Sequence, residues 1–272
     1  VPVGIFEMEM SSLTLYARLV ANESDVKARK ILTGSIRGRE VIRVKEALDR
    51  LAGLKIYVDE SSAVSIQDLV AKARKLKSDC PDLGLIVIDY LGLISGNTKT
   101  KKRFDNRQLE IQEYTRTLHE LARDLKIAIV LLCQLNRKVE ERGESGTPRL
   151  SDLRESGSIE QDAEIVLLLH RDDYGRNELL EKKEREKIKA KDMDADARRE
   201  LVATAEARAA AENQQNMKKN SPIMSVIIAK NRNGESDRSF DLMFEKEYSR
   251  FRDVSKEFQQ AKAAILDKKY NE

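Results

Sequence analysis

The sequence predicts an α/β fold in which helices flank a mostly parallel sheet, and two features of the chain support this. Short apolar runs rich in β-branched residues alternate with stretches of helical periodicity, a pattern typical of parallel strands buried on both faces. Three of these runs end at polar side chains: residues 2–6 at Glu7 and Glu9, 85–88 at Asp89, and 127–133 at Gln134. Because parallel strands end at one edge of a sheet, and open α/β sheets bind ligands there, we expect a site at this edge.

The other elements are expected in chain order as follows. Apolar periodicity, with Ser11, Ser12 and Ser65 as capping residues, predicts helices at 11–22, 38–51, 65–76 and 109–125. Further strands are predicted at 54–59 and 163–170, and loops rich in polar residues or helix breakers at 96–104 and 140–150. Asn233-Gly234 lies between the apolar runs 223–229 and 240–244, which predicts a β-hairpin that closes the sheet.

The composition is that of a globular chain without signs of secretion or membrane insertion. Its 272 residues suffice for one large domain or two small ones, and no apolar run approaches the roughly 18 residues that a membrane span needs. Two cysteines, Cys80 and Cys133, are too few for a disulfide framework, so a reducing cytoplasm is expected. The net charge of +3 is nearly balanced, so any nucleic-acid binding must come from a local arrangement of residues.

Two polar segments stand apart from the α/β pattern. Roughly half of residues 176–220 are charged, without proline or glycine, which predicts a long solvated helix or helical hairpin inserted into the domain. Apolar residues are too sparse there for a sustained coiled-coil seam, so a solvated insertion is favoured over a dedicated interface. Residues 255–272 form a polar, helix-prone tail, and the main domain is therefore expected to span 1–254.

The acids at the predicted sheet edge suit nucleotide hydrolysis. A carboxylate at the end of a buried strand, such as Asp89, is where nucleotide-hydrolysing folds hold magnesium through water, although many strands simply end in a capping aspartate. Glu9 or, on position alone, Glu7 could polarise a water for in-line attack. The alternative for either glutamate is an ordinary surface acid in the first turn of a helix.

Three further segments are candidates for contact with phosphate groups. Gln134 could sense a phosphate, because an amide hydrogen-bonds water or phosphate oxygen without a charge penalty. The polar run 151–162, with Arg154 and Gly157, suits a sugar-phosphate backbone, or forms only a capped surface helix. Lys230 and Arg232, near the hairpin turn, could serve as an arginine finger for a neighbour, or only solvate the hairpin.

Taken together and in this order, several motifs resemble the C-terminal motor domain of DnaB-type replicative DNA helicases. They are Phe-Glu-Met-Glu-Met, Leu-Ile-Val-Ile-Asp-Tyr, Leu-Leu-Cys-Gln-Leu-Asn-Arg, Asp-Leu-Arg-Glu-Ser-Gly-Ser-Ile-Glu-Gln-Asp-Ala-Glu and Ala-Lys-Asn-Arg-Asn-Gly, within residues 1–174 and 223–251. The resemblance implies a RecA-like sheet and a homo-hexamer around single-stranded DNA. It also implies 5′ to 3′ unwinding driven by ATP and Mg²⁺ in the cytoplasm of a bacterium or a phage-infected host, with primase and a helicase loader as partners.

The resemblance also assigns roles to individual residues. The family's catalytic glutamate precedes Met in a Leu-Glu-Met triplet, which selects Glu9 over Glu7. The resemblance also implies that Asp89 is the acid beside magnesium, Arg18 an arginine near the same site, and Gln134 the sensor of the nucleotide state. Lys230 and Arg232 would reach the nucleotide of the adjacent subunit. Arg154, Glu155 and Gly157 would contact the DNA backbone.

The chain departs from the family pattern in several places. Gly92 replaces a side chain near the site, and Glu7 stands where the family usually has a small residue. The sequence contains no Gly-x-x-x-x-Gly-Lys-Ser/Thr motif and opens with Val1 in what reads as mid-strand, so we expect a fragment that begins after the phosphate-binding loop. Such a fragment should hydrolyse ATP negligibly by itself.

Two other interpretations remain open at this point. The chain could be another RecA-like ATPase, such as a recombinase or a clock-type ATPase, although the run from Asp152 to Glu164 argues against this. It could also be a non-catalytic module that retains the DNA-binding loops and the ring contacts without using nucleotide.

Overall fold

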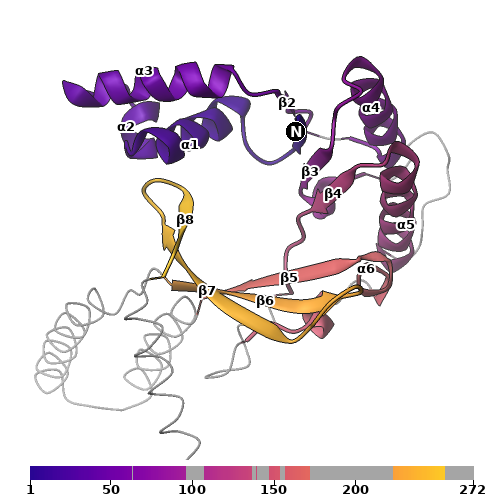
Figure 1. Ribbon diagram of the computed structural model, residues 1–272. Coiled ribbons are helices and arrows are strands. Elements are labelled where there is room, and N and C mark those ends of the chain that lie inside the picture. Colours follow the sequence, from indigo (N-terminus) through magenta and orange to yellow (C-terminus); the bar gives the residue numbers. More distant parts are fainter. Residues whose placement is uncertain are drawn as a thin grey trace, which may run out of the picture.

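The computed structural model describes residues 1–62, 64–95, 107–136, 139, 147–153, 157–171 and 223–254 (Figure 1). The predicted insertion at 176–220, the tail at 255–272, and Arg154 and Glu155 lie outside the described residues. Most of the two predicted loops, 96–104 and 140–150, lies outside them as well.

The N-terminal half of the chain forms a parallel four-stranded sheet in the order β2-β1-β3-β4. Its strands are β1 (Val3–Glu7), β2 (Ile56–Asp59), β3 (Leu85–Asp89) and β4 (Ala128–Leu131). The crossovers contain α1 (Ser12–Ser24), α2 (Ala28–Leu32) and α3 (Arg39–Ala52), then α4 (Ile66–Asp79), then α5 (Arg107–Leu125). The predicted alternation of strands and helices is therefore confirmed for this half.

The predicted capping residues begin two of these helices. The Ser11 hydroxyl accepts a hydrogen bond from the Thr14 N–H at 3.3 Å, and the Ser65 hydroxyl accepts one from the Asp68 N–H at 3.1 Å. Each serine thereby satisfies a backbone donor that has no partner within its helix. The starts of α1 and α4 are thus set locally by the sequence.

The sheet is covered by α4 and α5 on one face, where the main core lies (Figure 1). The buried residues of this face include Phe6, Ile86 and Ile88, packed with Leu69 of α4 and Tyr114 of α5, among others. On the opposite face Val130 is 49% exposed, and β1 and β3 alternate between buried and half-buried residues. The expectation of burial on both faces is therefore wrong for the described residues.

The reason for this difference is the position of the first three helices. α1, α2 and α3 pack on one another around a small separate core of Val20, Val26, Val44 and Ala47. In Figure 1 they form a group apart from the α4–α5 layer. The sequence pattern of a strand indicates that one of its faces is apolar, but it does not indicate which helix, if any, packs on that face.

The C-terminal half forms a second, antiparallel sheet in the order β5-β6-β7-β8. Its strands are β5 (Ile165–His170), β6 (Ile223–Asn231), β7 (Arg238–Glu245) and β8 (Arg250–Asp253). The predicted hairpin is confirmed as β6-β7, but it does not close the parallel sheet, because β5 pairs with β6 and not with β4. The short helix α6 (Gly157–Asp162) precedes β5 and contacts α5.

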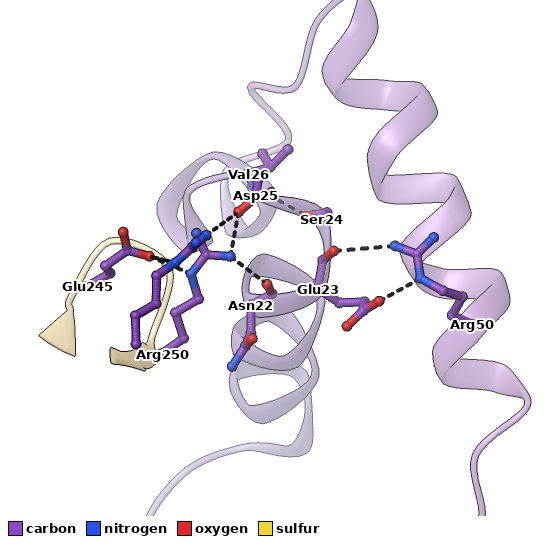
Figure 2. Close-up of polar contacts among 9 residues, drawn as sticks. Asn22, Glu23, Ser24, Asp25, Val26, Arg50, Glu245 and Arg250 are labelled. Atoms are coloured by element: carbon purple, nitrogen blue, oxygen red, sulfur yellow. Dashed lines mark hydrogen bonds and ion pairs between the residues drawn. The ribbon is translucent and has the colours of Figure 1, made fainter. Parts of the chain in front are cut away.

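The turn between β7 and β8 is attached to the end of α1 (Figure 2). Arg250 of β8 is 12% exposed, donates from Nη1 to the Asn22 carbonyl oxygen at 3.1 Å, and forms an ion pair with Asp25. Its Nε also lies 2.5 Å from Oε2 of Glu245. From the opposite side, Arg50 of α3 donates to the carbonyl oxygen and carboxylate of Glu23 at 3.3 and 2.5 Å.

These two arginines provide the positive charge that α1 itself lacks at its C-terminal end. The last turn of α1 contains no basic residue, although its final carbonyl groups carry partial negative charge and have no partners within the helix. Arg50 and Arg250 supply cations there from α3 and β8. The second sheet is thereby fastened to the helix that follows β1.

Candidate active site

The predicted gathering of acids at the carboxyl edge of the parallel sheet begins with Glu7 and Asp89. They occupy matching positions at the ends of the adjacent strands β1 and β3. Just beyond, the Met8 N–H donates to the carbonyl oxygen of Asp89 at 3.0 Å. Asp89 is half-buried, and Glu7 is only 2% exposed.

Glu9 lies in a tight turn between β1 and α1. Oε1 of Glu7 accepts hydrogen bonds from the Glu9 N–H at 3.1 Å and from the Met10 N–H at 2.9 Å. The Glu9 side chain is itself exposed. Sequence position alone could not distinguish Glu7 from Glu9, but their environments differ. Glu7 is buried, whereas Glu9 faces solvent.

The electrostatics of Asp89 show which groups surround it. Burial, together with the nearby carboxylates of Glu7 and Glu9, raises the pKa of Asp89 above its ordinary value, while the Arg18 guanidinium on α1 partly offsets this. Glu9 in the bend after β1, Asp89 on β3 and Arg18 on α1 therefore lie near enough for their charges to interact. Like charges at close range create a region where a cation is electrostatically favoured.

The donor set at this edge is compatible with Mg²⁺. Among the residues that the structure describes, no group of three or more His, Cys, Asp and Glu side chains is arranged to hold a metal ion. Mg²⁺ in nucleotide sites is usually held by one or two carboxylates, with water and phosphate oxygens completing its shell. Asp89 can supply a carboxylate in this manner.

Gln134 lies beyond the end of β4, next to the Asp89 segment. The Leu132 N–H donates to the Ile88 carbonyl oxygen, and the Leu91 N–H donates to that of Leu132, both at 3.0 Å. These bonds keep the chain that leads to Gln134 beside the chain that leaves Asp89. The Gln134 side chain is exposed at this edge.

Gly92 lies in the short helix η1 (Leu91–Leu93) that follows Asp89. A Cβ atom at this position would lie 2.5 Å from Cε2 of the Tyr90 ring. A larger residue at position 92 would therefore require the Tyr90 ring to move. The ring fills the space in which the family's side chain was expected.

Lys230 and Arg232 do not project freely from the hairpin within this chain. Arg232 donates from Nη1 to Oε1 of Glu164 at 2.6 Å and from Nη2 to the Gln161 carbonyl oxygen at 3.2 Å. The Lys230 ammonium binds the carbonyl oxygens of Glu160 and Gln161, at the end of α6. The Arg232 side chain is nevertheless 50% exposed, so its guanidinium is not buried in its own chain.

The predicted DNA-contact segment is described only in part. Gly157 begins α6, whereas Arg154 and Glu155 lie outside the described residues. Sequence reasoning did not find the roles of Glu7 and Glu164 as hydrogen-bond acceptors. The signal for Glu7 was its position at the last residue of a buried strand, while nothing in the sequence linked Glu164 to Arg232.

Comparison with known proteins assigns this arrangement to a family. A family model described as the DnaB-like helicase C terminal domain matches residues 1–253. The chain therefore belongs to the DnaB-like helicase C-terminal domain family, as the motifs suggested.

Similar curated relatives are replicative helicases. The replicative DNA helicase DnaB of Geobacillus stearothermophilus is 36% identical over 259 residues, which are 95% of this chain and 47% of the relative. The replicative DNA helicase DnaC of Bacillus subtilis is 35% identical over the same shares. The chain thus spans about half the length of the curated relatives that it matches.

Solved structures confirm the RecA-like α/β fold. A DnaB-like replicative helicase, described with its interactions with primase, has a TM-score of 0.70 at 27% identity, covering 93% of this chain and 51% of that chain. A solved ATPase domain has a TM-score of 0.71 at 27% identity, covering 93% of this chain and 75% of that chain. Among the described helices of this chain, none is long and apolar enough to cross a membrane.

Proposed function

We propose that residues 1–254 form part of the motor domain of a hexameric replicative helicase that hydrolyses ATP to unwind duplex DNA. In this proposal the ring moves 5′ to 3′ along single-stranded DNA. The observation that carries it is that the ends of β1 and β3 bring Asp89 and the turn containing Glu9 to the carboxyl edge of a RecA-like sheet, within the electrostatic influence of Arg18, in a chain of the DnaB-like family.

Within one subunit, the acids divide the chemistry of hydrolysis between them. Asp89 would hold Mg²⁺ through water, and the ion would supply positive charge beside the phosphate oxygens. Glu9 orients the attacking water and accepts its proton. The exposure of Glu9 supports this role, because the oxygen Oε1 of the buried Glu7 is already occupied by two backbone N–H groups.

Arg18 and Gln134 complete the site in the same subunit. Arg18 offsets the negative charge around Asp89, which supports a place for it beside the phosphates. Gln134 binds either water or a phosphate oxygen and so reports the nucleotide state to the segment after β4. That segment continues toward the predicted DNA-contact residues.

Other residues act between subunits and on DNA. Lys230 and Arg232 reach the nucleotide of the adjacent subunit, where a guanidinium stabilises transition-state charge. Arg154, Glu155 and Gly157 follow the backbone of single-stranded DNA. Primase and a helicase loader are the proposed protein partners, and the solved DnaB-like relative described with primase supports the first.

The test uses the complete protein encoded by the gene that contains this chain. Glu9→Gln should reduce ATP hydrolysis to a small residual rate and abolish unwinding of a forked duplex, while nucleotide and single-strand binding persist. Glu46→Gln, on the exposed surface of α3, is the control and should retain parental turnover. Parental turnover by Glu9→Gln would refute the assignment. A complete protein that binds single strands without any turnover would instead support the non-catalytic module.

A further inference from the structure

Glu7 is a buried carboxylate for which the proposed chemistry has no use. It is 2% exposed at the end of β1, in register with Asp89 on β3. Burying a carboxylate beside other acids is costly unless hydrogen bonds compensate it. Its presence therefore requires an explanation in terms of what it binds.

The hydrogen bonds of Glu7 fix the turn that carries Glu9. Its Oε1 accepts from the N–H groups of Glu9 at 3.1 Å and Met10 at 2.9 Å, while the Met8 N–H is bound to the Asp89 carbonyl oxygen at 3.0 Å. The N–H groups of the three consecutive residues Met8, Glu9 and Met10 are thus all hydrogen-bonded before Ser11 caps α1. The backbone on both sides of the Glu9 side chain is held in one conformation.

We propose that Glu7 is a positioning residue that holds the backbone of Glu9 so that its carboxylate projects from the sheet edge toward the attacking water. This inference rests on the proposed function. Displacement of a catalytic group by about 1 Å can cost about 10²-fold in rate.

Two explanations of the acid at this position predict different results. If its negative charge matters, by adding to the field that favours a cation beside Asp89, an aspartate should replace it. If its acceptor oxygen matters, a glutamine retains that oxygen, whereas an alanine or a shorter aspartate does not. The proposed positioning role requires the second explanation.

The test measures ATP hydrolysis by the complete protein with Glu7→Gln, Glu7→Asp and Glu7→Ala. Glu7→Gln should keep kcat within about threefold of the parent, whereas Glu7→Ala should lower kcat by about 10²-fold with the KM for ATP unchanged. In single-turnover measurements, Glu7→Ala should add no further loss to the residual rate of Glu9→Gln. Amide exchange at Glu9 and Met10 should accelerate in Glu7→Ala.

Several results would overturn the inference. They are full activity in Glu7→Ala, a raised KM instead of a lowered kcat, or an undiminished effect of Glu7→Ala in the Glu9→Gln background. If Glu7→Ala does not fold, Glu7→Asp and Glu7→Gln test the inference by themselves. An active Glu7→Asp together with an inactive Glu7→Gln would mean that the charge of residue 7 matters and the position of its acceptor oxygen does not. An active Glu9→Gln would instead remove the proposed function itself.

Discussion

Arg232 and Glu164 form an ion pair within one chain, with 2.6 Å between Nη1 and Oε1. Both side chains are about half exposed, and exposed pairs of this kind contribute only about 0.2–1 kcal/mol. In the proposed ring, a phosphate oxygen of the nucleotide on a neighbouring subunit can therefore compete with Glu164 for the guanidinium. The ion pair keeps Arg232 beside α6 but binds it only weakly.

The proposed action of Arg232 in trans can be tested by mixing subunits. Arg232→Ala should lower ATP hydrolysis by the complete protein about 10³-fold, the smaller end of the range for arginine fingers. Arg232→Ala and Glu9→Gln subunits should regain activity when mixed, because some interfaces then combine an intact Arg232 with an intact Glu9. Arg238→Ala, on the same hairpin, is the control and should change little. An inactive mixture of assembled rings would place Arg232 within its own subunit's site.

The raised pKa of Asp89 predicts how stability depends on pH. Between about pH 4, where an unfolded aspartate titrates, and the raised pKa of the folded chain, the native state binds more protons than the unfolded state. The free energy of unfolding contributed by Asp89 therefore falls as pH rises through this window. Asp89→Asn should stabilise the chain above the window and have no effect below about pH 4.

Urea unfolding of the 272-residue chain at several pH values measures this effect. Asp82→Asn, in an exposed turn, is the matched control and should shift the unfolding midpoint little at any pH. A stabilisation by Asp89→Asn that is equal at acidic and neutral pH would contradict the electrostatic explanation.

The attachment of β8 to α1 predicts a difference between two neighbouring arginines. Arg250→Ala should lower the free energy of unfolding by about 1–3 kcal/mol, since it removes a side chain that is only 12% exposed and donates to Glu245 and to the Asn22 carbonyl oxygen. Arg252→Ala, with a side chain that is 51% exposed, should cost less than about 1 kcal/mol. Urea unfolding of both variants makes the comparison. A loss for Arg250→Ala that is no larger than the loss for Arg252→Ala would contradict a special contribution of the Arg250 contacts in Figure 2.

The absence of a phosphate-binding loop from these 272 residues also predicts a biochemical result. The purified chain should show no magnesium-dependent ATP turnover above background, because no Gly-x-x-x-x-Gly-Lys-Ser/Thr segment is present to bind the β- and γ-phosphates. A phosphate-release assay with the chain alone measures this. Turnover that Glu9→Gln abolishes would show that these 272 residues suffice for hydrolysis.

The parallel half of the fold could be predicted because its signals are local. Ser11 and Ser65 cap helices within their own segments, and the strands ending at Glu7 and Asp89 needed only a common direction to bring their ends together. The acids at the edge followed from that direction alone. This is why Glu7 and Asp89 lie in matching positions, with the predicted catalytic residue Glu9 two residues beyond Glu7.

The second sheet and the contacts of Lys230 and Arg232 could not be predicted, because they depend on partners distant in sequence. The apolar run of β5 is compatible with pairing on β4 or on β6, and periodicity does not choose between them. Glu164 and Arg232 are 68 residues apart, and each is an ordinary charged residue in its own segment. Family resemblance supplied a role for Arg232 but not its resting partner.

The helix α1 joins the two halves of the molecule mechanically. Its first turn follows directly from the bend that contains Glu9. Its last turn accepts a hydrogen bond from Arg250 on β8, and Lys230 and Arg232 lie on the hairpin of the same sheet. A stiff rod held at both ends transmits displacement along its length. In the proposed motor, movement of the hairpin toward the nucleotide of a neighbouring protomer would therefore be transmitted through α1 to the turn that contains Glu9 in its own protomer, and hydrolysis at successive ring positions would be coupled in this way.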